Sequence, residues 1–98
     1  MSFVAKDYVK FRYAVRNPYV LVEALHAVSP RAEFYTAEIA EGVSARAGCH
    51  CIVSTVSRVV ADLNRYPDSQ NRLAVEEYRQ TIRGLLVHGQ ALDDKDRL

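Results

Sequence analysis

Two arginines, an asparagine and an aspartate gather in one short stretch of this sequence, from Ser57 to Arg65. The guanidinium group of Arg58 or Arg65 can bind a carboxylate through two parallel hydrogen bonds, and the Asn64 amide can add a neutral donor. These residue types therefore favour a small molecule with a carboxylate group as the ligand. The alternative is a solvated loop in which Asp62 pairs with one of the arginines, and the sequence leaves both interpretations open.

A histidine and a carboxylate farther upstream have the chemistry to begin a metal site. His26 follows an apolar segment, and Glu33 comes shortly after it. Imidazole and carboxylate groups are zinc ligands in hydrolases, in which three protein ligands leave a fourth position for water. The alternative is that His26 is a hydrogen-bonded structural residue. We expect such a structural role for His50 and His88.

The two cysteines, Cys49 and Cys51, are separated by a single residue. A disulfide between such close neighbours would be strained, so we expect reduced thiols and hence a reducing compartment, the cytoplasm. The alternative is a metal-binding role for one of them, although the Cys-x-x-Cys spacing of zinc clusters is absent from the sequence.

Three segments have the residue patterns of β-strands and are expected to position these side chains. Basic and apolar residues alternate from Lys10 to Arg16, which is typical of a strand with one wet face. A nearly continuous apolar run from Tyr19 to Leu25 predicts a strand buried on both faces. The short segment from Cys49 to Val56 is rich in β-branched residues and predicts a third strand.

Two further segments have the four-residue spacing of apolar side chains that marks one face of a helix. We predict a first helix over 34–47, ended by Gly48, and a second over 70–88, capped by Asp68 or Ser69 and ended by Gly89. The side chains expected on the buried faces are Tyr35, Ile39, Val43 and Ala47 in the first helix, and Ala74, Tyr78, Ile82 and Leu85 or Leu86 in the second.

A strand, a helix and a strand in succession form a βαβ unit, so the sequence predicts an α/β fold. We expect a small, open, mostly parallel sheet with a βαβ unit and a long C-terminal helix, which is a phosphorylase-like or hydrolase-like half-fold. Ligands in such sheets bind outside the carboxyl ends of the strands, where His26 and the Ser57–Arg65 stretch are expected. An open sheet also leaves an unpaired edge, which predicts self-association or cover by another polypeptide.

The composition is that of one globular domain spanning residues 1–98. The hydrophobic share is 49% and the charged share is 26%. Thirteen basic and twelve acidic residues leave a net charge of +1, which gives no electrostatic reason to expect nucleic acid or an anionic membrane as a partner. The longest apolar runs are too short to cross a bilayer.

Two segments of the sequence resemble the N-terminal portion of a known enzyme family. They are Tyr35-Thr36-Ala37-Glu38-Ile39-Ala40 and Ser57-Arg58-Val59-Val60-Ala61-Asp62-Leu63-Asn64-Arg65. With them, roughly residues 18–98 resemble the N-formylglutamate amidohydrolase family, and the second segment is the more specific. The resemblance implies the fold of the zinc-carboxypeptidase-like hydrolases and an activity that cleaves N-formylglutamate to formate and glutamate.

The resemblance also implies roles for individual residues. It implies that His26 and Glu33 are zinc ligands. It further implies that Arg58, Asn64 and Arg65 bind the carboxylates of the substrate, an N-acyl amino acid. The family's later histidine ligand and its acid–base carboxylate belong to a C-terminal half that has no counterpart in this sequence, so no catalytic residue is assigned.

Two functions from different classes follow from these patterns. The first is a truncated or split zinc amidohydrolase half that retains a carboxylate-binding turn and needs a complementing C-terminal polypeptide for activity. The second is a non-catalytic binding or interaction module that uses the same scaffold. The partners expected in either case are a small carboxylate-bearing molecule and either a second copy of the chain or the complementing polypeptide.

Overall fold

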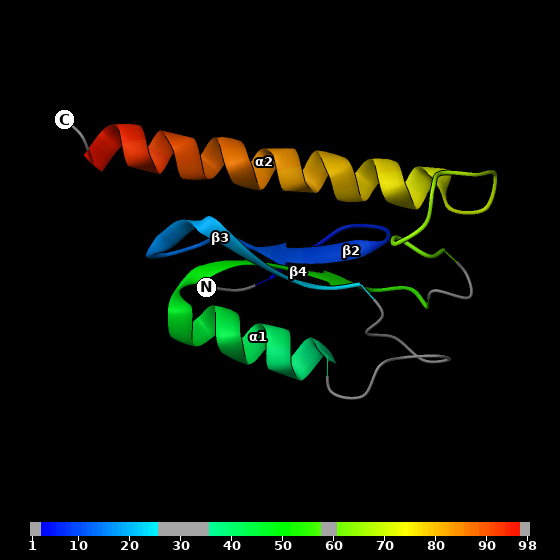
Figure 1. The fold of residues 1–98 in the computed structure, drawn as a ribbon, viewed down its shortest axis with the longest axis horizontal. Helices are drawn as coiled ribbons and strands as arrows, with labels where there is room; N and C mark the ends of the chain where they lie inside the picture. The colour runs from blue at the N-terminus through cyan, green and yellow to red at the C-terminus, as the bar shows by residue number, and fades with distance from the viewer. Residues whose placement is uncertain (1–2, 26–35, 58–60, 97–98) are drawn as a thin grey trace.

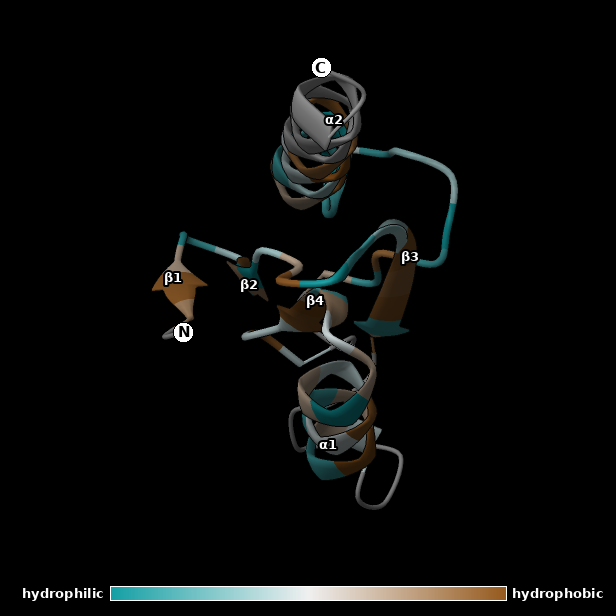
Figure 2. Cartoon of the chain, turned by 90° about the vertical axis from the view of Figure 1, so that its left-hand side faces the viewer, coloured by the Kyte–Doolittle hydropathy of each residue, from teal (hydrophilic) through white to brown (hydrophobic). Residues whose placement is uncertain are grey.

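The described residues form three layers, with a four-stranded sheet between two helices (Figure 1). The computed structural model describes residues 3–25, 36–57 and 61–96, with side chains as far as residue 87. The elements follow the order β1 (Val4–Ala5), β2 (Val9–Arg12), β3 (Asn17–Ala24), α1 (Thr36–Ala47), β4 (Cys49–Ser54) and α2 (Arg72–Asp96). Figure 2 shows α2 over one face of the sheet and α1 over the other. The predicted α/β fold is confirmed at this level.

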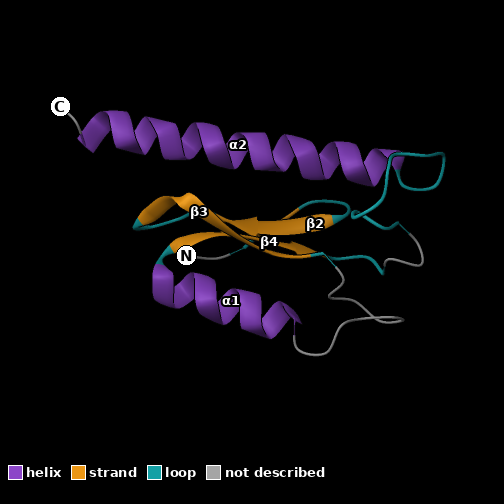
Figure 3. Ribbon diagram, viewed as in Figure 1, coloured by secondary structure: helices purple, strands orange, loops and turns teal. Residues whose placement is uncertain are grey.

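The sheet is mixed, with the strand order β1-β2-β4-β3 (Figure 2). Its strands, orange in Figure 3, lie between the two purple helices. β3 and β4 are parallel and are connected through α1, which confirms the predicted βαβ unit. β2 runs antiparallel to both β1 and β4, so the prediction of a mostly parallel sheet is wrong. The reason is the short connection over 13–16 between β2 and β3, because parallel strands need a crossover of a dozen or more residues. The chain therefore reverses direction between these two strands.

β2 ends at Arg12 rather than at Arg16, the end predicted for it. The amide N–H groups of Val15, Arg16 and Asn17 all donate to the Gly48 carbonyl, at 3.0, 2.9 and 3.0 Å. Successive N–H groups that converge on one oxygen need a turn conformation rather than an extended one. The chain consequently leaves the strand at this point and turns into β3.

β4 is a central strand of the sheet, and β3 lies at an edge. All six residues of β4 are buried. On β3, in contrast, Tyr19 is 65% exposed and Val20 is 50% exposed. The prediction that Tyr19–Leu25 is buried on both faces is therefore wrong, although Leu21 and Val22 do pack toward opposite sides of the sheet. β4, in contrast, pairs with β2 on one side and with β3 on the other, so both of its edges are covered.

Two groups of buried side chains hold the layers together. The group that joins the sheet to α2 contains Val9, Phe11, Ile52, Ala61, Leu63, Ala74, Val75 and Leu85. The group that joins the sheet to α1 contains Ala24, Ala40, Cys51 and Val53. The second group is smaller and is made of smaller side chains, so α1 lies close against the sheet.

α1 confirms the predicted first helix and its stop signal but not its predicted buried face. Gly48 follows the helix with a φ of 68°, a left-handed conformation that glycine adopts without strain. Ile39 is 61% exposed and Val43 is 48% exposed, whereas Ser44 is buried. The hydroxyl of Ser44 donates to the Cys49 carbonyl at 2.8 Å, and this bond turns the small side chains of the helix toward β4.

α2 is longer than the predicted second helix. It continues through Gly89, the expected stop, to Asp96. A single glycine inside a helix costs only about 1 kcal/mol, which the residues on either side can outweigh. The predicted buried face is confirmed for Ala74 and Leu85, but Leu86 is 57% exposed. None of the helices in the described part of the chain has the length and apolarity that a membrane crossing requires.

Candidate carboxylate-binding site

The described residues of the predicted Ser57–Arg65 stretch are Ser57, which follows β4, and residues 61–65, which belong to the loop before α2. In its described part, Ala61 and Leu63 are buried in the core beneath α2, while Asn64 and Arg65 are exposed. The buried side chains of Ala61 and Leu63 attach the loop to the core, and those of Asn64 and Arg65 remain on the surface.

A reciprocal cap fixes this loop where it meets α2. Asp68 Oδ1 accepts from the amide N–H groups of Gln70 and Asn71 at 2.8 and 3.0 Å, and Asn71 Oδ1 accepts from the Asp68 N–H at 2.7 Å. Asn71 Nδ2 donates back to the carbonyls of Asp62 and Tyr66 at 2.9 and 3.3 Å. The prediction of Asp68 as a cap is confirmed, and the buried Asn71 side chain holds the whole loop in one shape.

A surface hollow of about 410 Å³ lies between the loop and α2. The residues that line it are Leu63, Asn64, Arg65, Tyr66 and Arg79. One arginine comes from the loop and one from the helix, and none of the lining residues is acidic. Two guanidinium groups and an amide at one hollow favour an anion, and the planar guanidinium fork matches the paired oxygens of a carboxylate.

Arg65 also has an acidic neighbour within the loop. Its Nε lies 3.5 Å from Asp62 Oδ2, and the Arg65 side chain is 79% exposed. Asp62 Oδ1 in turn accepts from the Asn64 N–H at 2.9 Å, which holds the carboxylate against the loop. The ion pair expected from the alternative interpretation is therefore present. At this distance and exposure it is worth at most about 1 kcal/mol, so a ligand carboxylate can compete for the guanidinium group.

The structure brings two of the predicted site residues together, since Asn64 and Arg65 line the same hollow. Arg58, His26 and Glu33 lie outside the described residues, so their predicted place beside the other two stays a prediction.

Two lining residues were missed by the sequence analysis, which singled out neither Tyr66 nor Arg79 as part of a site. Arg79 comes from the exposed side of α2, and no local pattern links it to loop residues that lie 13 to 16 positions upstream. The link is tertiary, because Leu63 packs into the same buried group as Ala74 and Val75 of α2. That contact places the loop against the helix.

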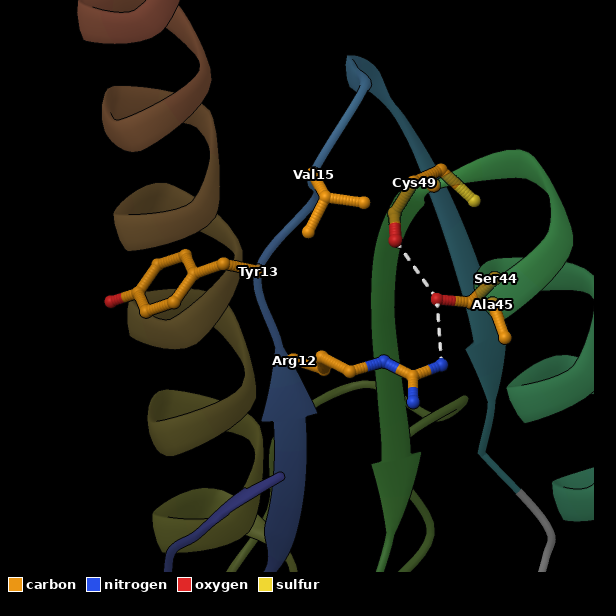
Figure 4. Close-up of a pocket in the computed structure, with 7 residues that line it drawn as sticks. Arg12, Tyr13, Val15, Ser44, Ala45 and Cys49 are labelled. Carbon is orange, nitrogen blue, oxygen red and sulfur yellow. Dashed lines mark hydrogen bonds between the residues drawn. The ribbon is translucent and has the colours of Figure 1, made fainter. Parts of the chain in front are cut away.

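A second arginine-lined hollow, of about 150 Å³, has a structural explanation (Figure 4). Arg12 Nη2 donates to the Glu41 carbonyl at 3.0 Å and to the Ser44 hydroxyl at 3.1 Å. Figure 4 shows the guanidinium group reaching from β2 to Ser44, which itself bonds the Cys49 carbonyl. These bonds tie β2, α1 and β4 together, so the cation is already used inside the fold.

Cys49 and Cys51 are free, buried thiols, as expected. Burial raises the pKa of the Cys51 thiol above its ordinary value and outweighs the positive charge of Arg12, which lowers it. A thiol that is kept protonated is a poor nucleophile and a poor metal ligand. Cys51 therefore serves as a small apolar side chain of the core.

His50 has the structural role predicted for it. It is 2% exposed, its Nδ1 accepts from the Ala14 N–H at 2.9 Å, and its Nε2 lies 2.9 Å from the Pro18 carbonyl. These partners require the neutral ring with its proton on Nε2. Within 3–25, 36–57 and 61–87, no three histidine, cysteine or acidic side chains gather as metal ligands do. The predicted zinc ligands lie outside those ranges, and zinc stays a prediction.

Comparisons with known proteins add no family to this picture. No protein-family model matches the chain, and neither a curated protein nor a solved structure does so. The argument for function consequently rests on the residues themselves.

Proposed function

We propose that this chain binds a small carboxylate-bearing molecule in the hollow between its Ala61–Asn71 loop and α2. The observation that supports this most directly is that Arg65 and Arg79 line one hollow together with Asn64. Two cations at one surface site repel each other, and an anion between them removes that repulsion. The site is therefore suited to an anion with several acceptor oxygens.

The shape of the loop favours binding because little ordering is needed when the ligand arrives. The cap between Asp68 and Asn71 and the burial of Leu63 hold the backbone on both sides of Asn64 and Arg65. Binding then costs mainly the rotamer freedom of the two arginine side chains. Tyr66, which is exposed, supplies an aromatic ring for the carbon chain of the ligand.

The enzymatic interpretation is a second proposal, and it rests on the resemblance alone. In it the chain is one half of a zinc amidohydrolase, with His26 and Glu33 as metal ligands and the same hollow holding the carboxylate of an N-acyl amino acid. Metal analysis of the purified protein decides it, because bound zinc in a stoichiometric amount is required and its absence would exclude this mechanism.

The binding proposal is tested by calorimetric titration of the chain with succinate and with L-glutamate at low ionic strength. We expect saturable binding that weakens as salt is added, because the site is open to solvent. Arg65→Ala and Arg79→Ala should each weaken binding at least about tenfold, since a hydrogen bond to a charged group is worth roughly 1.5–3 kcal/mol.

Arg46→Ala is the matched control, because Arg46 is exposed and belongs to α1 on the opposite face of the sheet (Figure 2). It removes the same unit of charge from the molecule but leaves the hollow intact, so binding should be unchanged. The proposal is wrong if neither ligand shows saturable binding. It is also wrong if Arg46→Ala weakens binding as much as Arg65→Ala, because the effect would then be one of net charge.

A further inference from the structure

The hollow proposed to bind a carboxylate, here called the ligand hollow, has an acidic neighbour. A separate hollow of about 280 Å³, the aspartate hollow, also touches Arg65. The residues that line it are Asp62, Arg65, Asp68, Gln70 and Asn71. Arg65 therefore shares one hollow with a second arginine and the other with two carboxylates.

We propose that Asp62, assisted by Asp68, makes the ligand hollow selective for a carboxylate that carries a single negative charge. Anions with two negative charges, such as dicarboxylates and phosphate monoesters, are disfavoured. This inference rests on the proposed function, because it concerns the ligand of the same hollow.

The carboxylate of Asp62 is fixed beside Arg65 by the loop itself. Its Oδ1 accepts from the Asn64 N–H at 2.9 Å, and its Oδ2 lies 3.5 Å from Arg65 Nε. The Asp62 side chain is only 19% exposed, and the Asp62 carbonyl accepts from Asn71 Nδ2 at 2.9 Å. The carboxylate therefore cannot turn away into water without losing its bond to the loop when a ligand anion arrives.

The charges around Arg65 explain the selectivity. Arg65 and Arg79 bring two positive charges to the ligand hollow, and Asp62 already offsets one of them. A singly charged carboxylate offsets the other, and Arg65 can hold it together with Asp62 because a guanidinium group has further donors. A second negative charge on the ligand finds no further cation among the described lining residues, and it is repelled by Asp62 and Asp68. Arginine alone binds carboxylates and phosphates alike, so the aspartates supply the discrimination.

Asp62 has two opposing effects on an anion bound at Arg65. Its ion pair restrains the long Arg65 side chain, which lowers the entropy cost of binding. Its negative charge repels the ligand. The restraint is the same for every ligand, whereas the repulsion grows with the charge of the ligand. A change in the ratio of two affinities when Asp62 is neutralised therefore reports the repulsion alone.

The test is calorimetric titration of the full chain with succinate and with succinamate, its monoamide, at neutral pH. The two ligands have nearly the same shape, but succinate carries two negative charges and succinamate one. We expect the wild-type protein to bind succinamate at least as tightly as succinate, per carboxylate group.

Asp62→Asn removes the negative charge but keeps the side-chain oxygen that accepts from the Asn64 N–H. The affinity ratio should shift toward succinate by roughly fivefold, from Coulomb's law for charges about 8 Å apart with a dielectric constant of about 40. A merely structural role of Asp62 would weaken the binding of both ligands and leave the ratio unchanged.

Two further variants complete the test. Glu38→Gln is the matched control, because Glu38 is exposed and belongs to α1 on the opposite face of the sheet (Figure 2), so the ratio should stay unchanged. Asp68→Asn keeps the Oδ1 that accepts from the N–H groups at the start of α2, and it should shift the ratio in the same direction as Asp62→Asn but by less. If Asp62→Asn fails to fold, Asp68→Asn decides alone.

Three results would overturn this inference and leave the proposed function standing. They are an unchanged ratio in the folded aspartate variants, an equal shift in Glu38→Gln, and a wild-type protein that prefers succinate per carboxylate group. Binding of neither ligand by the wild-type protein would overturn the proposed function and this inference together.

Discussion

The contact between Glu77 and the turn before β2 provides the sharpest test of how this fold is held together. Glu77 Oε1 accepts from the Asp7 N–H at 3.0 Å, and its Oε2 accepts from the N–H groups of Tyr8 and Val9 at 2.6 and 3.1 Å. One carboxylate of α2 therefore binds three successive amides of the chain near its N-terminus. We expect Glu77→Ala to destabilise the protein more than the change of any neighbouring surface residue.

The size of this effect can be worked out from the three bonds. A hydrogen bond to a charged group contributes roughly 1.5–3 kcal/mol when it is sheltered from water. The bond to Asp7 is exposed, whereas those to Tyr8 and Val9 are partly buried. Counting the exposed bond as negligible and discounting the other two for partial exposure, we expect Glu77→Ala to lower the free energy of unfolding by about 2–3 kcal/mol. Glu77→Gln keeps one acceptor oxygen and should cost about half as much.

The assay is equilibrium unfolding in urea, with Glu76→Ala as the matched control. Glu76 is the exposed neighbour of Glu77 on α2, so its removal changes the charge of the helix equally but breaks none of the three bonds. A surface change of this kind should stay within about 0.5 kcal/mol. Hydrogen exchange should also accelerate selectively at the amides of Asp7, Tyr8 and Val9. Equal destabilisation by the two variants would refute the reasoning.

Two further predictions concern groups on the β3 side of the molecule and in the core. Burial and the hydrogen bond to Glu23 raise the pKa of Tyr78 well above its ordinary value, so the folded state retains a proton that the unfolded state loses. Stability should therefore be full below about pH 10 and fall as the pH rises further, and melting curves of Tyr78→Phe should show a shallower fall than those of the wild type. His50→Phe should lower the free energy of unfolding by about 2–4 kcal/mol, because it leaves the Ala14 N–H and the Pro18 carbonyl without their partner, and a urea titration that finds no difference from wild type would contradict this.

The sequence distinguishes helices from strands because apolar side chains recur at a different spacing in each. It fails on which strand is central, since Tyr19–Leu25 and Cys49–Val56 are both apolar runs. Burial in a sheet depends on the strands and helices on either side, and that order is a property of the whole chain. The length of the β2–β3 connection did contain the information that these strands run in opposite directions.

The first helix shows a different reason for failure. Ile39 and Val43 are its most apolar regularly spaced side chains among the described residues, yet the sheet contacts Ala40 and Ser44 instead. The bond from Ser44 to β4 needs a close approach, which larger side chains would prevent.

The sequence predicted two of the residues that line the hollow but not the others. Arginine and asparagine in one loop predicted carboxylate binding from residue type alone, and Asn64 and Arg65 do share a hollow. Arg79 joins them only because Leu63 packs beneath α2, a contact without a local signal in the sequence.

Polar side chains that hold the fold together differ in their contacts from the two arginines at the hollow. Among the described residues, every buried side-chain nitrogen and oxygen atom has a hydrogen-bond partner. Arg12 and Asn71 illustrate this, because each joins separate segments of the chain through backbone carbonyls. Arg65 and Arg79 differ from them, since both are exposed and both line the hollow without bonding the backbone of another segment. Removing either should therefore leave the fold intact, whereas the proposed carboxylate ligand would lose one of its two cationic partners.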